Sequence, residues 1–196
     1  MIFRKRNRRK KITTYGEFLT LYPCCRPSHQ EYLLKKLWKA GKPSFLHDKE
    51  VPENFNTITY GQLDDLSRAR NSEDPAVTSI EIIMGMTAEE IYKLNVFDVF
   101  GFANFCLNEL TRINKLFQSI KPSHSSEEIA AGINDLDFGT FGVVDWYAKR
   151  MGITNQDEVF NVAWIRIFTC MKNDNATNEY ESRLHKQYIE SAKRKK

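Results

Sequence analysis

The sequence NVFDVFGFANFCLNELTRINKLFQSI, residues 95–120, decides the fold class. Its apolar residues recur at alternating steps of three and four positions, which is the spacing of a helix that buries one stripe. Asn95 can cap the first turn with Asp98 at the third helical position, and Lys121-Pro122 ends the last turn. The stripe consists of Val96, Val99, Ala103, Cys106, Leu110, Ile113, Phe117 and Ile120. We therefore predict a long central helix over about residues 95–120.

Additional aromatic residues broaden the apolar surface of this helix in its first half. Phe97, Phe100, Phe102 and Phe105 place bulky apolar side chains on more than one side of the helix. A helix that is apolar over a wide arc is buried among several neighbours. The segment is thus typical of the centre of an α-helical domain. The alternative is a helix that also packs against a neighbouring subunit.

Short motifs mark the starts of further helices. In a capping box, a Ser or Thr is followed three residues later by Glu or Gln, and each side chain bonds the other residue's backbone N–H. Asp74-Pro75 supplies a cap and a proline at the first helical position, and Ser125 with Glu128 precedes another helix. Gly41, Gly85 and Gly152 stand where helices are expected to end. The capping boxes begin at Thr14, Ser28, Thr59 and Thr87.

These signals predict a mainly α protein, a multi-helix bundle around the long central helix. A small β-hairpin is expected near residues 44–52. We assign residues 12–192 to a single helical domain, with a subdivision near 121–126 as the alternative. The predicted helices cover about residues 15–21, 28–40, 60–70, 75–84, 88–94, 95–120, 126–133, 140–151, 155–172 and 175–193.

The charge of the chain is distributed unevenly. The formal net charge is +4, but residues 4–11 have seven basic side chains, residues 193–196 have four more, and neither stretch has an acid. Without these eleven residues, 18 basic and 25 acidic side chains remain, so the body has a net charge of −7. Basic arms suit DNA phosphates or an acidic protein surface, although they also occur as tails with no fixed partner. The arm residues are Arg4, Lys5, Arg6, Arg8, Arg9, Lys10, Lys11, Lys193, Arg194, Lys195 and Lys196.

Composition excludes some classes of protein. With 196 residues the chain can form one hydrophobic core or two small ones, and its 41% hydrophobic content is ordinary for a folded soluble protein. No window has the 18 or more apolar residues of a membrane span, so we expect no membrane partner. Glu17 interrupts the apolar part behind the basic start, which argues against a signal peptide.

Common catalytic and metal-binding motifs do not occur in the sequence. No phosphate-binding glycine loop, H-E-x-x-H or G-x-S-x-G is present. Cys24 and Cys25 with His29 and His47 match a zinc site poorly, because neighbouring cysteines differ from the usual paired spacing. Reduced cysteines in a cytoplasmic setting fit the spacing best. We therefore expect a protein that is not an enzyme, with no cofactor and no metal.

The last 40 residues suggest a contact with a neighbouring subunit. Residues 158–171 are apolar on nearly every side, and residues 175–193 are mostly polar with a thin apolar stripe. A helix that is apolar all round is either buried in the core of the chain or covered by a partner. The residues that we assign to a subunit interface are Phe160, Trp164, Phe168, Tyr180, Leu184 and Tyr188.

Two groups of segments resemble a known class of proteins. The first is Val51-Pro52-Glu53 with Ile58-Thr59-Tyr60-Gly61-Gln62-Leu63 and Ile80-Glu81-Ile82-Ile83. The second is Phe138-Gly139, Val143-Val144-Asp145-Trp146, Glu158-Val159 and Glu179-Tyr180-Glu181-Ser182-Arg183-Leu184. Over roughly residues 45–190, this pattern of caps and apolar spacing is similar to small helical head–tail connector and tail-assembly proteins of tailed bacteriophages.

The resemblance implies a structural role in a viral particle. The expected protein is a subunit of a ring at the head–tail junction, or a tail-assembly factor, found in the virion and in the host cytoplasm during assembly. Its partners would be copies of itself, a portal or neighbouring tail protein, and DNA phosphates. The alternative is a nucleic-acid-binding regulatory protein that uses the basic arms, although no helix resembles a base-reading recognition helix.

Overall fold

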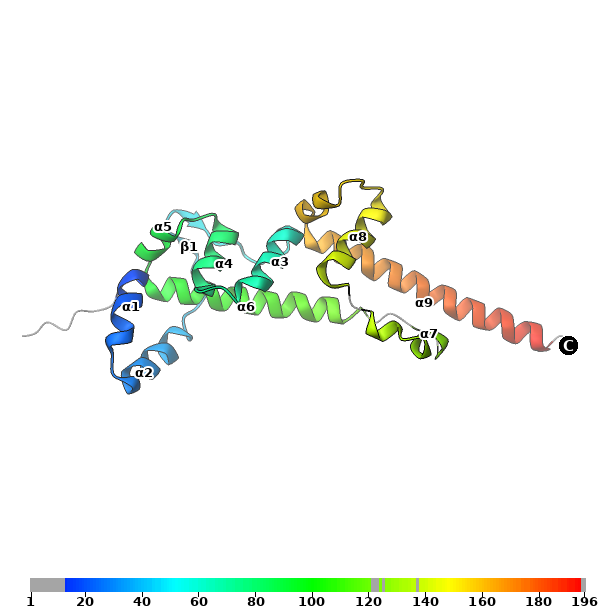
Figure 1. The fold of residues 1–196 in the computed structure, drawn as a ribbon, viewed down its shortest axis with the longest axis horizontal. Helices are drawn as coiled ribbons and strands as arrows, with labels where there is room; N and C mark the ends of the chain where they lie inside the picture. Colours follow the sequence, from blue (N-terminus) through cyan, green and yellow to red (C-terminus); the bar gives the residue numbers. More distant parts are fainter. Residues whose placement is uncertain (1–12, 121–123, 125, 137, 195–196) are drawn as a thin grey trace, which may run out of the picture. The chain divides into compact units, whose positions relative to one another are not determined.

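The computed structural model of the protein describes residues 13–120, 124, 126–136 and 138–194 (Figure 1). These residues are mostly helical, so the predicted mainly α fold class is confirmed. The described residues form two compact units, one within residues 13–53 and 68–108, the other within residues 54–67 and 109–194. The assignment of a single helical domain stays a prediction, because compact units that share helices need not be separate folding domains.

Helix α6 (Val96–Gln118) is the predicted long helix and contributes residues to both units. The Asn95 side chain caps it by accepting a hydrogen bond of 2.9 Å from the backbone N–H of Phe97. The stripe is buried as expected at Val99, Cys106 and Ile113, while Leu110 is only partly buried. The predicted stop at Lys121-Pro122 lies outside the described residues.

The first unit is built on the N-terminal part of α6. Its helix α1 packs against α5, and α5 packs against α4 (Figure 1). Phe100 of α6 contacts the rings of Tyr15, Phe18 and Trp38, with centroid separations of 6.2, 5.3 and 5.4 Å. The elements of this unit are α1 (Tyr15–Leu21), the 3-10 helix η1 (Tyr22–Cys24), α2 (Pro27–Leu37), β1 (Phe45–Leu46), β2 (Lys49–Glu50), α4 (Pro75–Met84) and α5 (Ala88–Lys93).

The predicted small hairpin is confirmed. Strands β1 and β2 pair antiparallel, with Phe45 opposite Glu50 and Leu46 opposite Lys49. Leu46 is almost completely buried, so one side of the hairpin adds to the core of the first unit. The Lys49 ammonium group donates to the carbonyl oxygen of Met84 at 2.8 Å and thereby holds the hairpin against the end of α4.

Most of the predicted helix caps are confirmed. Capping boxes form between Thr14 and Glu17 and between Thr87 and Glu90. A third forms between Thr59 and Gln62, where the side chain of each residue accepts a hydrogen bond from the backbone N–H of the other. Asp74 caps α4, and both Gly85 and Gly152 end helices in the left-handed conformation. The cap expected from Ser125 lies outside the described residues.

Two predicted helix ends are wrong. The Ser28 box does not form because α2 starts at Pro27, which suits the first helical position, so Ser28 falls within the first turn. Gly41 is not a helix terminator, since α2 already ends at Leu37. Its backbone instead lies against α6, where the Gly41 carbonyl oxygen occupies the space that a side chain at Gly101 would need.

The second unit contains the C-terminal elements. Helix α8 packs against η3, and Arg150 of α8 forms an ion pair with Asp174 of α9 (Figure 1). The unit also includes most of helix α3 (Tyr60–Ala69) and the C-terminal part of α6. Its other elements are α7 (Ser126–Ala130), the 3-10 helix η2 (Ile133–Asp135), α8 (Gly139–Met151), the 3-10 helix η3 (Gln156–Asn161) and α9 (Trp164–Arg194).

The two helices predicted over 155–172 and 175–193 are corrected to a short 3-10 helix followed by the single helix α9. The interruption occurs at Val162, which is extended because its carbonyl oxygen accepts a hydrogen bond from the Tyr60 N–H at 2.8 Å. The backbone N–H of Trp164 in turn donates to the Ile58 carbonyl oxygen. No proline or glycine follows to end the helix near residue 174, so α9 continues to Arg194.

Substituting Gly101 tests the close approach of the 38–43 connection to α6. A Gly→Ala change inside a helix normally stabilises a protein by up to about 1 kcal/mol. We expect Gly101→Ala to destabilise it instead, since the new Cβ would overlap the carbonyl oxygen of Gly41. Urea unfolding measures the sign. Gly41→Ala is the matched control because its Cβ would meet nothing within 4 Å. A stabilised Gly101→Ala protein would contradict this packing.

Candidate functional site

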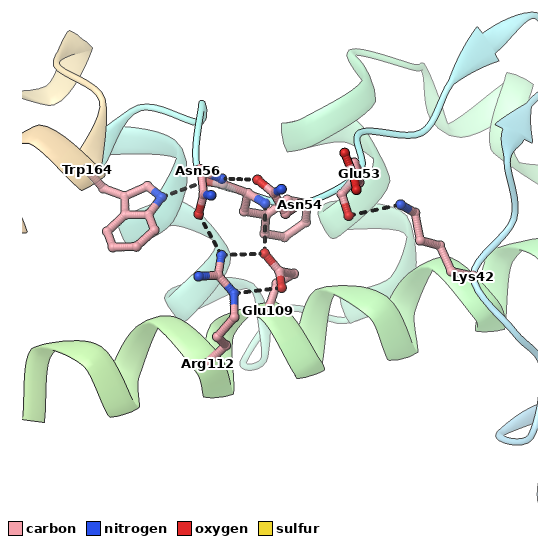
Figure 2. A network of polar contacts seen from close by, with 8 residues as sticks. Lys42, Glu53, Asn54, Asn56, Glu109, Arg112 and Trp164 are labelled. Carbon is pink, nitrogen blue, oxygen red and sulfur yellow. Dashed lines mark hydrogen bonds and ion pairs between the residues drawn. The ribbon is translucent and has the colours of Figure 1, made fainter. Parts of the chain in front are cut away.

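A buried carboxylate organises the interior of the second unit (Figure 2). Glu109 of α6 is 9% exposed and accepts a hydrogen bond of 2.7 Å from the backbone N–H of Phe55. Arg112, one turn further along α6, donates to both carboxylate oxygens at 2.7 and 2.9 Å. Its guanidinium group also donates to the side chain of Asn56 at 2.9 Å. The hydrogen bond to Glu109 raises the pKa of Arg112, so this guanidinium group stays charged at neutral pH.

Trp164 attaches the first turn of α9 to the same loop. Its indole N–H donates to the Phe55 carbonyl oxygen at 2.5 Å, and the Arg112 guanidinium lies over its ring at 5.9 Å (Figure 2). Both backbone groups of Phe55 are therefore satisfied by buried side chains. Sequence analysis did not single out Glu109. The sequence did contain a signal for this buried carboxylate. Glu109 lies three residues after Cys106 and four before Ile113, at the spacing of the apolar stripe, and Arg112 follows one turn later.

The residues assigned to a subunit interface occupy different environments. Trp164 and Phe168 are 0% and 8% exposed, because they pack with Phe117 inside the second unit. Phe160 is partly exposed on η3 and covers Gly61. Tyr180 and Tyr188 are 57% and 66% exposed, so only the later part of α9 presents large apolar side chains to solvent.

The apolar stripe of α9 faces away from the side that the helix buries. At 100° per residue, Tyr180 lies about 160° around the helix from Trp164, and Leu184 lies about 160° from Phe168. Tyr188 follows one turn after Leu184 on the same side. No residue of α9 after Phe168 is buried among the described residues. The surface formed by Tyr180, Leu184 and Tyr188, which we call the α9 stripe, is thus separate from the core of the unit.

A second group of exposed apolar residues lies between α7 and α8. Ile129 and Leu136 are 53% and 59% exposed, and Phe138 and Phe141 are 70% and 60% exposed. The Phe138 Cβ lies over Gly142 at the start of α8 and occupies the space that a side chain there would need. Soluble proteins rarely leave several large apolar side chains in one segment uncovered unless the segment binds something.

The outer face of α2 in the first unit is basic. Lys35, Lys36 and Lys39 share this face with the exposed Tyr32, and His29 lies against the Tyr32 ring at 6.3 Å. Neither Lys35 nor Lys39 forms an ion pair with any described residue. The arm residues from Arg4 to Lys11, together with Lys195 and Lys196, lie outside the described residues, while Lys193 and Arg194 are exposed at the end of α9.

The second unit has two small pockets. One of about 220 Å³ is lined by Tyr60, Asp64 and Thr140, where the Thr140 hydroxyl donates to Asp64 at 2.8 Å. Burial, together with the charge of Asp64, raises the pKa of Tyr60 to about 12, so its phenol stays protonated at neutral pH. The other, of about 270 Å³, has an apolar wall that includes Trp146 and Met171. Neither pocket combines groups that indicate a particular ligand.

The described residues contain no group of three or more His, Cys, Asp or Glu side chains placed to hold a metal ion. None of the helices in the described part of the chain combines the length and the hydropathy that crossing a bilayer requires. Comparison of the chain with protein-family models, with curated proteins and with solved structures finds no match. The functional argument therefore depends on the surfaces themselves.

Replacing Glu109 tests the buried network. We expect Glu109→Ala to lower the free energy of unfolding by about 1–3 kcal/mol, because the Phe55 N–H would remain buried without an acceptor. Urea unfolding followed by tryptophan fluorescence measures the loss. Glu181→Ala, an exposed position on α9, is the control and should change stability by less than about 0.5 kcal/mol. Equal effects of the two substitutions would contradict a structural role for Glu109.

Proposed function

We propose that this protein is a non-enzymatic structural subunit of a larger protein assembly and binds a neighbouring protein through the α9 stripe. The observation that carries the proposal is the exposure of Tyr180 and Tyr188 on the part of α9 that follows its buried residues Trp164, Ile167 and Phe168. An amphipathic helix that presents an apolar side to solvent is a common element of protein recognition. Tyrosines are also enriched among the residues that contribute most to binding energy.

The particular assembly that we propose is the head–tail junction of a tailed bacteriophage. The chain would be a connector or ring-type subunit there, or a tail-assembly factor, present in the virion and in the host cytoplasm during assembly. The resemblance of residues 45–190 to such proteins supports this choice, and so does a mainly helical fold with a long C-terminal helix. The neighbours would be copies of the same chain and a portal or tail protein, and no cofactor would be needed.

Incorporation into particles tests this function. We expect quantitative mass spectrometry of purified particles of the encoding phage to detect the protein at a fixed ratio to the portal protein. Tyr180→Ser with Tyr188→Ser should reduce incorporation at least about tenfold, because two aromatic contacts would be lost. Lys186→Ser with Glu190→Ser is the control, because both residues are exposed and lie about 160° and 120° around the helix from Leu184. Absence of the protein from particles would reject the proposed assembly, and full incorporation of the tyrosine variant would reject the role of the stripe.

The basic face of α2 favours nucleic-acid binding as a second candidate function. Unpaired lysines beside an exposed aromatic ring can bind phosphates while the ring stacks on a base. The N-terminal arm, which lies outside the described residues, has seven basic residues in positions 4–11. This arrangement would suit a regulatory protein that binds nucleic acid, or a particle component that contacts packaged DNA.

Salt dependence tests the second candidate. Each phosphate neutralised changes the slope of log affinity against log salt concentration by about 0.7–0.9. Lys35→Gln with Lys39→Gln should therefore lower the slope by about 1.4–1.8 for an oligonucleotide, measured by fluorescence anisotropy. Lys115→Gln with Lys172→Gln, two exposed lysines of the second unit, should leave the slope unchanged. An unchanged slope in the α2 variant would exclude this face as the phosphate contact.

A further inference from the structure

The basic face of α2 presents a largely exposed aromatic ring among its lysines. Tyr32 is 61% exposed, and Lys35 and Lys36 lie about 60° and 40° around the helix from it. Lys39 follows in the next turn, where its backbone N–H donates to the Lys36 carbonyl oxygen at 3.3 Å. The His29 ring meets the Tyr32 ring at 61°, so it does not lie flat on the tyrosine. The ring is therefore open to a flat ligand that is also negatively charged.

Little negative charge opposes these lysines. Residues 26–39 contain four basic side chains and one acidic one, a net charge of +3 with histidine neutral. The acid, Glu31, forms no ion pair with any described residue. Lys36 is already engaged, because its ammonium group lies over an aromatic ring of α6 at 5.7 Å. The other two lysines, Lys35 and Lys39, are about 6 Å apart along the helix, which is one to two nucleotide steps of a strand.

We infer that this face binds single-stranded nucleic acid, with one base stacked on Tyr32 and adjacent phosphates bound by Lys35 and Lys39. This inference rests on the second candidate function, nucleic-acid binding. A base in a single strand can offer its whole face to a protein ring, whichever base it is. The bases of a duplex are stacked on one another and offer only their edges in the grooves. An exposed ring between phosphate-binding lysines therefore favours single strands over duplexes.

The same face has little that could read a base sequence. A recognition helix reads base edges mainly with Arg, Asn and Gln side chains. Helix α2 contains one residue of these types, Gln30, and its amide already donates to the Tyr22 carbonyl oxygen at 2.9 Å. Lysines and tyrosines bind phosphates and base faces, which every nucleotide has. We therefore expect binding that depends strongly on salt and little on sequence.

An abasic strand separates stacking from charge, because it has the phosphates of oligothymidylate but no bases. Fluorescence anisotropy measures the binding of the full chain to each labelled probe. We expect Tyr32→Ala to bind oligothymidylate about 5–150-fold more weakly, the range of one lost stacked base. The slope of log affinity against log salt concentration should not change, since stacking releases no counterions. The same variant should bind the abasic strand and a duplex of equal length as the wild type does.

Three controls accompany this measurement. Tyr32→Phe keeps the ring and should bind oligothymidylate as the wild type does. Tyr180→Ala removes a tyrosine that is 57% exposed on α9 and should leave binding to every probe unchanged. The urea midpoint of Tyr32→Ala should equal that of the wild type, because the ring is mostly exposed in the folded chain. Oligouridylate in place of oligothymidylate distinguishes RNA from DNA, and dependence on Tyr32 with either strand supports the inference.

The outcomes that contradict stacking differ from those that contradict nucleic-acid binding. Full affinity of Tyr32→Ala for both single strands would overturn the inference, and so would an equal loss on the abasic strand or the duplex. If Lys35→Gln with Lys39→Gln still lowered the salt slope, nucleic-acid binding by α2 would stand without the stacked base. If the wild type bound no nucleic acid, or if polyglutamate displaced it as well as oligothymidylate does, the face would belong to an acidic protein and both would fall.

Discussion

The hydrogen bonds of Glu109 are the constraint on which the second unit depends. The carboxylate is buried, and it holds the backbone of Phe55 on one side and the guanidinium of Arg112 on the other. Trp164 satisfies the Phe55 carbonyl oxygen, so the loop, α6 and the start of α9 share one set of polar contacts. A buried charge is tolerated only when it is paired and hydrogen-bonded, and removing one member leaves the others buried without partners. These shared contacts hold the loop around Phe55 against α6 and the first turn of α9.

The position of α9 follows from these contacts. Trp164 is the first helical residue, and its indole and backbone N–H groups bond Phe55 and Ile58. Because the helix is rigid over short distances, this attachment sets the direction of every later side chain. The α9 stripe then falls on the side away from the core. From the sequence alone, the same residues resemble a continuation of the apolar segment 158–171. The exposure of Tyr180 and Tyr188 is thus a consequence of how the buried end is held.

Local features of the sequence were enough to predict most of the helices. The Thr14, Thr59 and Thr87 caps involve residues within three positions of each other, and the stripe of α6 follows from its spacing alone. The features that could not be predicted depend on residues far apart in the chain. Val162 is extended because it pairs with Tyr60, and Gly101 is required because Gly41 lies against it. For the same reason, the sequence showed that residues 158–171 are apolar but not what covers them. In the structure, Trp164 is buried within the chain, whereas Tyr180 further along the helix is exposed.

The later part of α9 has few interactions of its own to keep it helical. Glu179 forms a 3.9 Å ion pair with Arg183 and accepts a hydrogen bond from Asn175, and the basic residues at the end favour the helix dipole. Such contacts contribute only a few tenths of a kcal/mol each, and a helix of this length without tertiary packing is marginal in water. A partner that covers Tyr180, Leu184 and Tyr188 would therefore stabilise the helix as well as bind it. In the proposed assembly, neighbouring copies already held in place would remove the loss of translational freedom from each later contact, so the same helix would associate more firmly there than in solution.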